Sequence, residues 1–532
     1  MRLRIMAALA VLLSIGTVPA AQADIGLGPG GQTPGTAKNF TLVGHTPLAG
    51  RGMNAAPAMY NHFIYVGNRT DGSNRCGVGD PRIPVTGPNS CPHVLPGIAV
   101  VDVADPVHPT VVGEFATEFT TGANVGQTSR ELRVWPQQGL LMVMYFRCST
   151  VIHACSAGPG VFSIRFFDLA ASAVAPPLIA TYVPSRPPHE MFLWADPTDS
   201  ERALLWLSTP TSSVNPNTAN LLITDISRAR DGVFTEVARG NWNSLYPGAS
   251  SPATYDFDLA VHSMGVSADG TRTYLAYLRG HFLVLDTTAV ATGELPPGGV
   301  LSLNDALLTP VENRPRWGTA DGGCLDACAE SHSAVKVPGR PFALTTDEVY
   351  GTFTAASFGC PWGWARLIQV AQPKRPHIIG EYRLPANLPA FCGSPTDDPA
   401  TEQFTSYSSH NPTLTRNLAF ITWHSGGLQA IDIADPGKPG QAGWFSPTPL
   451  STVATEDPAL SRGPNKVVMW SYPIMADGLV YVVDIRNGLY VLRYDGPHAA
   501  EIAALGFLEG NSNLGDAVRL DKSAGTPERS TS

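Results

Sequence analysis

Four histidines are spaced along the chain so that one site could collect them. His189, His262, His332 and His410 each lie six or seven residues before a short turn that joins two predicted strands. The gaps between them are 73, 70 and 78 residues, so the spacing varies while the position relative to the turn is kept. Imidazole is the commonest transition-metal ligand, and converging neutral rings suit Fe, Cu, Zn or Mn. The register therefore predicts a metal site.

The same position before the turn holds other residue types elsewhere, namely Asn54, Glu131 and Trp470. These leave room for water or substrate, as a catalytic metal site requires. Glu131 is the candidate catalytic residue, either as a general base or as a fifth ligand. The remaining candidates are expected to orient ligands or contact substrate: Asn54, Arg130, Glu190, Asp258, Glu330, His424 and Trp470.

A structural role for the histidines is the alternative. Repeats arise by duplication, so one histidine that bonds a neighbouring loop would be copied with its repeat. Four rings around one axis would repel one another when protonated, which favours a metal or catalytic role over a purely structural one.

An internal repeat supplies the elements that must position these residues. Each copy is an alternating β-branched strand, a turn rich in Asp and Pro, and a second strand, preceded by another strand pair. Four strands in each of seven units predict an all-β fold, a seven-bladed β-propeller. The copies of the phrase span 97–115, 161–182, 220–238, 281–303, 366–382, 427–445 and 488–497.

The last copy is cut short and lacks its outermost strand. An unclaimed strand, Phe40 to Gly44, precedes the first unit. We expect it to complete the last blade and close the ring, which leaves no open edge. Two separate β-sandwiches, the rival fold, would not produce seven copies of one phrase.

The phrase I/V-x-V-V/I-D-x-x-x-P, as in IAVVDVADP from Ile98, resembles the LVIVD-repeat family of exported propellers over roughly residues 40–497. That resemblance implies the fold and says almost nothing about activity. The layout of axial histidines is also similar in outline to three propeller families with histidine-bound metals: carotenoid-cleaving oxygenases, selenium-binding proteins with methanethiol oxidase activity, and oligogalacturonate lyases. This likeness, which has no local sequence match behind it, implies metal chemistry.

Composition excludes several classes of protein. Of the 532 residues, 43% are apolar and 15% charged, which excludes a wholly disordered chain. The net charge of -9 provides no basic surplus for nucleic acid. With 52 Gly and 47 Pro, turn formers are too frequent for a helical bundle.

The first residues have the pattern of a signal peptide: Arg2 and Arg4, an apolar run, and Ala21-Gln22-Ala23 as cleavage site. The run is too short to span a bilayer, so a secreted or extracytoplasmic protein without a transmembrane anchor is predicted, starting near Asp24. The expected organisation is a signal peptide over 1–23, a linker over 24–39, the propeller over 40–497, and a short helix with a disordered tail over 498–532.

Eight cysteines in an exported chain predict disulfides before metal thiolates. They map, with nearly all the long insertions, to one face of the propeller, where disulfides would pin the loops. Nearest-neighbour pairing gives Cys76–Cys91, Cys148–Cys155, Cys324–Cys328 and Cys360–Cys392, and other connectivities stay open.

The sequence thus predicts an exported, metal-dependent enzyme, a monomer, with Fe or Cu favoured and Zn or Mn as alternatives. Oxidative chemistry on a small, fairly apolar or neutral substrate is the first hypothesis. A non-catalytic extracellular propeller that binds a protein or a glycan is the second. A metal-assisted lyase or hydrolase is the third.

Overall fold

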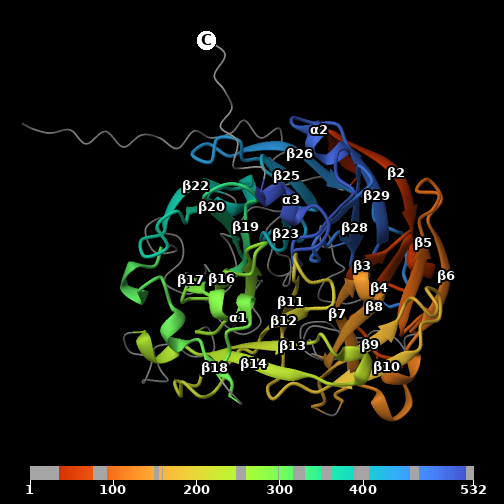
Figure 1. The fold of residues 1–532 in the computed structure, drawn as a ribbon. Helices are drawn as coiled ribbons and strands as arrows, with labels where there is room; N and C mark the ends of the chain where they lie inside the picture. The colour runs from red at the N-terminus through yellow and green to blue at the C-terminus, as the bar shows by residue number, and fades with distance from the viewer. Residues whose placement is uncertain are drawn as a thin grey trace, which may run out of the picture.

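Antiparallel sheets stand around a central axis and form a β-propeller (Figure 1). Inner strands such as β11 (Glu190–Ala195) lie near the middle, and outer strands such as β6 (Thr110–Phe115) lie at the rim. The computed structural model describes residues 35–75, 93–148, 155–158, 160–246, 259–296, 299–315, 330–348, 362–388, 390, 407–455 and 466–522.

The first two units are joined into one sheet because β4 and β7 touch through the pair Asn68 and Ser129. Each unit by itself is four antiparallel strands in chain order. Their strands are β3 (Asn54–Tyr60), β4 (Phe63–Asn68), β5 (Ile98–Asp102), β6, β7 (Gln127–Trp135), β8 (Leu140–Arg147), β9 (Ser163–Asp168) and β10 (Leu178–Tyr182).

The later units repeat this pattern, with apolar cores between the faces of neighbouring sheets. Their strands are β11, β12 (Ala203–Ser208), β13 (Leu221–Asp225), β14 (Thr235–Gly240), β15 (Ser263–Val266), β16 (Arg272–Ala276), β17 (Phe282–Asp286), β19 (Ser331–Lys336), β20 (Phe342–Asp347), β21 (Ala365–Gln369), β22 (His377–Tyr382), β23 (Pro412–Leu414), β24 (Leu418–Thr422), β25 (Leu428–Asp432), β26 (Gly440–Ser446), β27 (Ile474–Ala476), β28 (Leu479–Asp484) and β29 (Gly488–Tyr494).

The recurring aspartate of the repeat shapes the turn after the third strand. Asp102 Oδ1 accepts the Ala104 N–H at 2.8 Å, and Asp432 Oδ1 accepts the Ala434 N–H at 2.9 Å. A short carboxylate that accepts the N–H two residues on closes a tight turn without help from other elements. The phrase in the sequence is therefore a turn signal repeated from unit to unit.

The N-terminal strand β2 (Phe40–Thr46) lies beside β29, antiparallel, in the position of a fourth strand. The register of its pairing with β29 shifts by one residue between Leu42 and Gly44. The outer strands of other units show the same register shift against their neighbours. A Cβ at Gly44 would lie 2.1 Å from the Pro106 carbonyl oxygen, and one at Gly380 in β22 would lie 2.0 Å from the Pro436 oxygen. Only glycine lets the neighbouring turn approach so closely.

The predicted linker is partly structured, because β1 (Thr36–Lys38) pairs with β26. Residues 1–34, which include the predicted signal peptide, lie outside the described residues. No helix among the described residues has the length and apolar character needed to cross a bilayer.

The fourth unit differs from the predicted strand–turn–strand over 281–303. After β17 the chain forms the helix α1 (Thr288–Thr292), and β18 (Leu301–Ser302) pairs in parallel with β14 of the preceding unit. The described sheet here has three strands. The segment after Asp286 is TTAVATG, which has no Pro to end a helix and contains two Ala, so α1 forms where a turn was predicted.

The C-terminal segment also differs from the short helix and disordered tail predicted over 498–532. It forms α2 (Ala499–Ala503), β30 (Phe507–Leu508), which pairs with β27, and α3 (Ala517–Lys522). Between these elements Asn513 is buried: its Oδ1 accepts the Ala195 N–H at 2.8 Å, and its Nδ2 donates to the Ala195 and Ala268 carbonyls. The polar side chain of Asn513, in a segment whose composition suggested a tail, instead forms hydrogen bonds to backbone groups at the ends of the inner strands.

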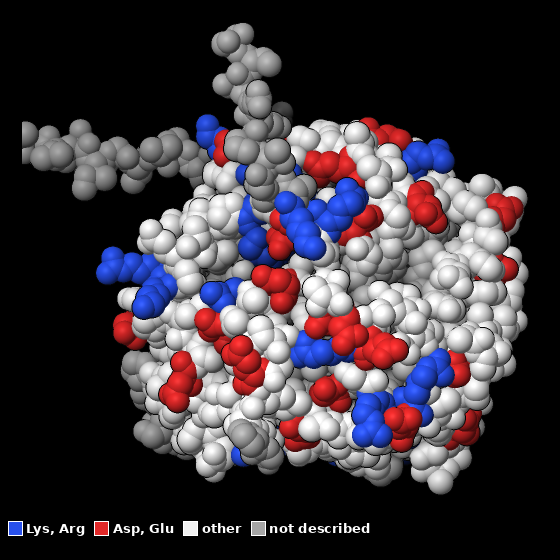
Figure 2. Space-filling model, in the orientation of Figure 1, with Lys and Arg blue, Asp and Glu red and all other residues white. Residues whose placement is uncertain are grey.

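Figure 1 looks onto the face that carries α3, and the same face in Figure 2 shows acidic and basic side chains mixed across the surface. The C-terminal segment lies across the inner strands at this end of the channel, where Leu193 pairs with Ser512. The predicted histidine site lies at the other end of the same strands.

Candidate metal centre

The four ring histidines lie side by side at the start of successive inner strands. His189, His262 and His410 precede β11, β15 and β23, and His332 lies within β19. His189 Nε2 lies 2.9 Å from His262 Nε2. The ring centroids of His262 and His332 are 4.0 Å apart, and those of His332 and His410 are 3.9 Å apart. Residues up to 221 positions apart in the chain thus form one continuous arc of imidazoles.

Glu348 lies against this arc and is a residue that sequence reasoning missed. Its Oε1 lies 3.0 Å from His410 Nε2 and its Oε2 lies 3.4 Å from His332 Nε2. Glu348 directly follows β20, at the end of the strand next to a long insertion. That placement, an acid at the strand end on the elaborated face, was the available signal.

His424 belongs to the same cluster, beyond its predicted role in contacting substrate. Its Nε2 lies 3.3 Å from Glu348 Oε1, and its side chain is 2% exposed. Glu348 and His424 hold equivalent places in neighbouring units, two residues after Thr346 and Thr422. The backbone of His424 has a φ of 39°, a left-handed conformation that costs free energy for a residue with a Cβ and is found preferentially at functional sites.

The possible ligand atoms fall into three overlapping triads, within each of which all atoms lie within 4.8 Å of one another. Each contains two histidines and one glutamate. We call them the first triad (His189, Glu190, His262), the middle triad (His262, His332, Glu348) and the last triad (Glu348, His410, His424).

The cluster is electrostatically ready for a cation. Burial, reinforced by neighbouring charges, lowers the pKa of His189 and His332 well below the usual value, and burial lowers the pKa of His262 and His424 to about 4. Burial alone would raise the pKa of Glu348, but the adjacent His332 and His410 outweigh it and hold that pKa well below its usual value. Neutral imidazoles with an ionised carboxylate are the protonation states in which these groups bind metals.

His410 is oriented by the backbone of the next unit. Its Nδ1 lies 2.6 Å from the Trp470 carbonyl oxygen. A carbonyl oxygen can only accept, so Nδ1 carries a proton and Nε2 is the nitrogen that faces Glu348 and the cluster. A backbone partner that fixes the ring and its tautomer is the usual support of a metal-binding histidine.

Glu131, the predicted catalytic residue, lies in β7 and belongs to none of the three triads. Its Oε2 accepts a hydrogen bond from Arg133 Nη2 at 3.0 Å, and the same nitrogen donates to the Met191 carbonyl. Arg133 is 1% exposed. The pair holds the second and third units together below the histidines. Glu131 is thus buried in an ion pair, near Glu190 of the first triad but outside the three triads themselves.

Glu190, predicted only to orient a ligand, has its carboxylate beside the nitrogens of His189 and His262. Burial, together with the charge of Glu131, raises the pKa of Glu190 well above its usual value. Among the described residues, none donates a hydrogen bond to this carboxylate. A buried acid in that situation is stabilised by a bound cation or a bound proton.

Two cation–aromatic pairs lie on the side of the ring that lacks histidines. The Arg69 guanidinium lies 3.9 Å from the centre of the Trp470 ring, whose other contacts include the His410 ring at 6.0 Å. Arg130 lies 4.6 Å from the ring centre of Phe146, which contacts His189. Both arginines bring positive charge toward His189, and this charge contributes to lowering its pKa.

The remaining predicted residues lie elsewhere. Asn54 is committed to structure: Oδ1 accepts from the buried Arg51 Nε at 2.7 Å, and Nδ2 donates to the Asp484 and Ile485 carbonyls. Glu330 lies 3.5 Å from Arg279 Nε. Asp258 lies outside the described residues.

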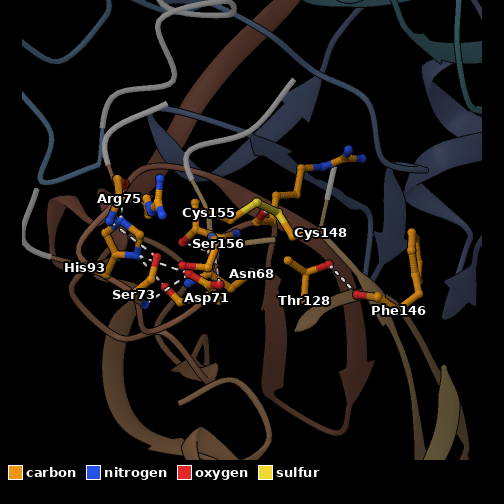
Figure 3. Close-up of a disulfide and its surroundings, with 12 residues drawn as sticks. Asn68, Asp71, Ser73, Arg75, His93, Thr128, Phe146, Cys148, Cys155 and Ser156 are labelled. Carbon is orange, nitrogen blue, oxygen red and sulfur yellow. Dashed lines mark hydrogen bonds and ion pairs between the residues drawn. A yellow bond between two sulfur atoms is a disulfide. The ribbon is translucent and has the colours of Figure 1, made fainter. Parts of the chain in front are cut away.

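One disulfide, Cys148–Cys155, is present in the described residues and matches the nearest-neighbour prediction (Figure 3). It packs against the segment that carries Arg69, since Cys148 Sγ contacts the Arg69 carbonyl oxygen at 3.5 Å and the Ser156 N–H donates to Asp71 at 3.1 Å. The other predicted cysteines lie outside the described residues: Cys76, Cys91, Cys324, Cys328, Cys360 and Cys392.

Comparison with known proteins gives little beyond this geometry. No protein-family model matches the chain, and no curated protein matches it. Among solved structures, the β-propeller domain of Myceliophteria thermophila Cps50 (Swd1) is similar, at 9% identity and a TM-score of 0.39, over 83% of this chain and 96% of that one. A similarity of this size carries no inference about function.

Proposed function

We propose that the protein is a metal-dependent enzyme whose transition metal is bound at the channel mouth by the ring histidines and Glu348. The observation that carries this proposal is that the Glu348 carboxylate contacts three imidazoles and belongs to two triads of possible ligand atoms. Two histidines and one carboxylate around an open position are the ligand set of non-haem iron oxygenases. Oxidative chemistry with Fe is therefore the leading reaction class, and such an ion would supply O₂ activation.

The surrounding side chains would bind and orient the substrate. Trp470 and Phe146 offer aromatic surface beside the metal ligands, which suits a small molecule with an apolar body. Burial of His332 and His424 keeps bulk water from most of the ligand shell.

A metal-assisted hydrolase is the second candidate, because two histidines and a glutamate also bind catalytic zinc. The two candidates predict different metals and different cosubstrates. A non-catalytic binding propeller predicts no tightly bound metal at all.

We further propose that the chain is exported after cleavage near Asp24, and that it forms seven blades with β2 completing the last. The paired position of β2 and the repeated glycine of the outer strands support the closure. The resemblance to LVIVD-repeat propellers supports both features, and membership of that family stays a prediction.

Elemental analysis of the full chain, purified without chelators, tests the metal proposal. We expect bound transition metal in the wild type and its loss in His332→Ala, with metal retained in a control variant, His108→Ala, whose histidine is exposed on a turn. O₂ uptake in the Fe-loaded protein against ester or phosphoester hydrolysis in the Zn-loaded protein distinguishes the two enzymes. Metal-free wild type after growth in metal-replete medium would refute both.

A further inference from the structure

The ligand cluster is too extended for one ion to use all of it. Its seven residues divide into three triads, and the first and last triads have no residue in common. A first-row transition metal binds four to six ligand atoms at about 2.0–2.2 Å, so ligand atoms on one ion lie within about 4.4 Å of each other. One ion can therefore be bound by the first triad or by the last triad, but not by both.

The carboxylate of Glu348 lies between the two ends of the arc. Oε1 lies 3.0 Å from His410 Nε2 and 3.3 Å from His424 Nε2, whereas Oε2 lies 3.4 Å from His332 Nε2. Oε1 therefore belongs with the last triad, and Oε2 belongs with the middle triad.

The first triad has its own reason to hold a cation. The nitrogens of His189 and His262 are 2.9 Å apart, close to the separation of about 3 Å expected for neighbouring ligands on one ion. The Glu190 carboxylate lies beside them, so that two imidazoles and one carboxylate offer ligand atoms within 4.8 Å of one another. An ion here would be bound by a mixed nitrogen and oxygen ligand set that transition metals accept.

We infer that the channel mouth binds two divalent transition-metal ions, one in the first triad and one in the last, with Glu348 and the middle triad between them. The inference rests on the proposed function, because it assigns the same cluster. Two adjacent ions stabilise both the attacking and the leaving oxygen of a displacement, or share the electrons of an oxidation, which one ion cannot do alone. The site would thus accept a substrate that bridges two metals through oxygen atoms.

Mn²⁺ titration of the metal-stripped full chain tests this inference, with stoichiometry measured by elemental analysis and magnetic coupling by electron paramagnetic resonance. We expect two Mn²⁺ per chain and the spectrum of a coupled pair. His189→Asn and His424→Asn should each leave one uncoupled Mn²⁺, and the control His108→Asn should leave two. The wild-type measurement needs no variant, so misfolding of a variant does not decide the result.

One uncoupled Mn²⁺ per wild-type chain, lost in both His189→Asn and His424→Asn, would overturn the two-ion centre and leave the proposed metal enzyme standing. No bound Mn²⁺ in the wild type would overturn both.

Discussion

Replacing Glu348 with Gln is the change that isolates the carboxylate from the histidines. The amide has nearly the same shape and keeps one oxygen acceptor, but it loses the negative charge that three imidazoles contact. Changing a residue that only orients a metal ligand costs about 10–100-fold in affinity. Because Glu348 belongs to two of the three triads, we expect at least about a 100-fold loss of metal affinity, or about 2.7 kcal/mol.

The same substitution should also destabilise the metal-free protein. The Glu348 carboxylate is held by charge-assisted contacts, and a hydrogen bond to a charged group contributes about 1.5–3 kcal/mol. Competition with a coloured chelator measures metal affinity, and urea unfolding in excess chelator measures the free energy of unfolding. The matched control is Glu236→Gln, which alters a glutamate bonded to Tyr182 on an outer strand and should leave affinity unchanged. Affinity of Glu348→Gln within about threefold of wild type would refute Glu348 as a ligand.

Four further changes have defined outcomes. Arg366→Met leaves the buried Asp347 carboxylate without its main charge partner, which should lower the free energy of unfolding in urea by about 3–5 kcal/mol, and a loss below about 1 kcal/mol would contradict that role. Burial raises the pKa of Glu509, so the stability contributed by its neutral form is lost as pH rises above about 4.5. Glu509→Gln should therefore gain stability over wild type from pH 5 to pH 8 and show no gain near pH 4; an equal gain at all pH values would rule this out. Asp432→Ala removes the acceptor of the Ala434 N–H and should lower the free energy of unfolding in urea by about 1 kcal/mol. An unchanged urea midpoint would contradict this role of Asp432. Removing metal with chelator should lower stability by about 2.7 kcal/mol relative to protein at a metal concentration one hundred times its dissociation constant, and coincident melting curves would count against a bound metal.

Local signals in the sequence were sufficient to predict the strands and turns that repeat from unit to unit. The turn aspartates, such as Asp102, and the outer-strand glycines, such as Gly380, act within a few residues or against one neighbouring turn. Their roles can therefore be inferred from the copies of the repeat in which they occur. Where a copy departs from the phrase, as after Asp286, α1 replaces the predicted turn, and the strand that follows, β18, pairs with the preceding unit.

The C-terminal segment shows what composition alone misjudges. Asn511 and Asn513 are polar in a region without periodicity, which is typical of a frayed end. In the structure the Asn511 backbone carbonyl accepts the Leu193 N–H, and the Asn513 side chain bonds backbone groups of Ala195 and Ala268. No property of the segment itself reveals that these partners exist.

The sequence by itself determined that four histidines share one position in successive repeats. The rotational symmetry of a propeller then brings these four residues around one axis. Only the tertiary structure decided that Glu348 and His424 complete the cluster and that Glu131 is bound by Arg133 instead. The physical reason is the range of the interactions. A register repeats along the chain and can be counted, whereas the direction of a side chain at a strand end depends on the neighbouring sheets that pack against it.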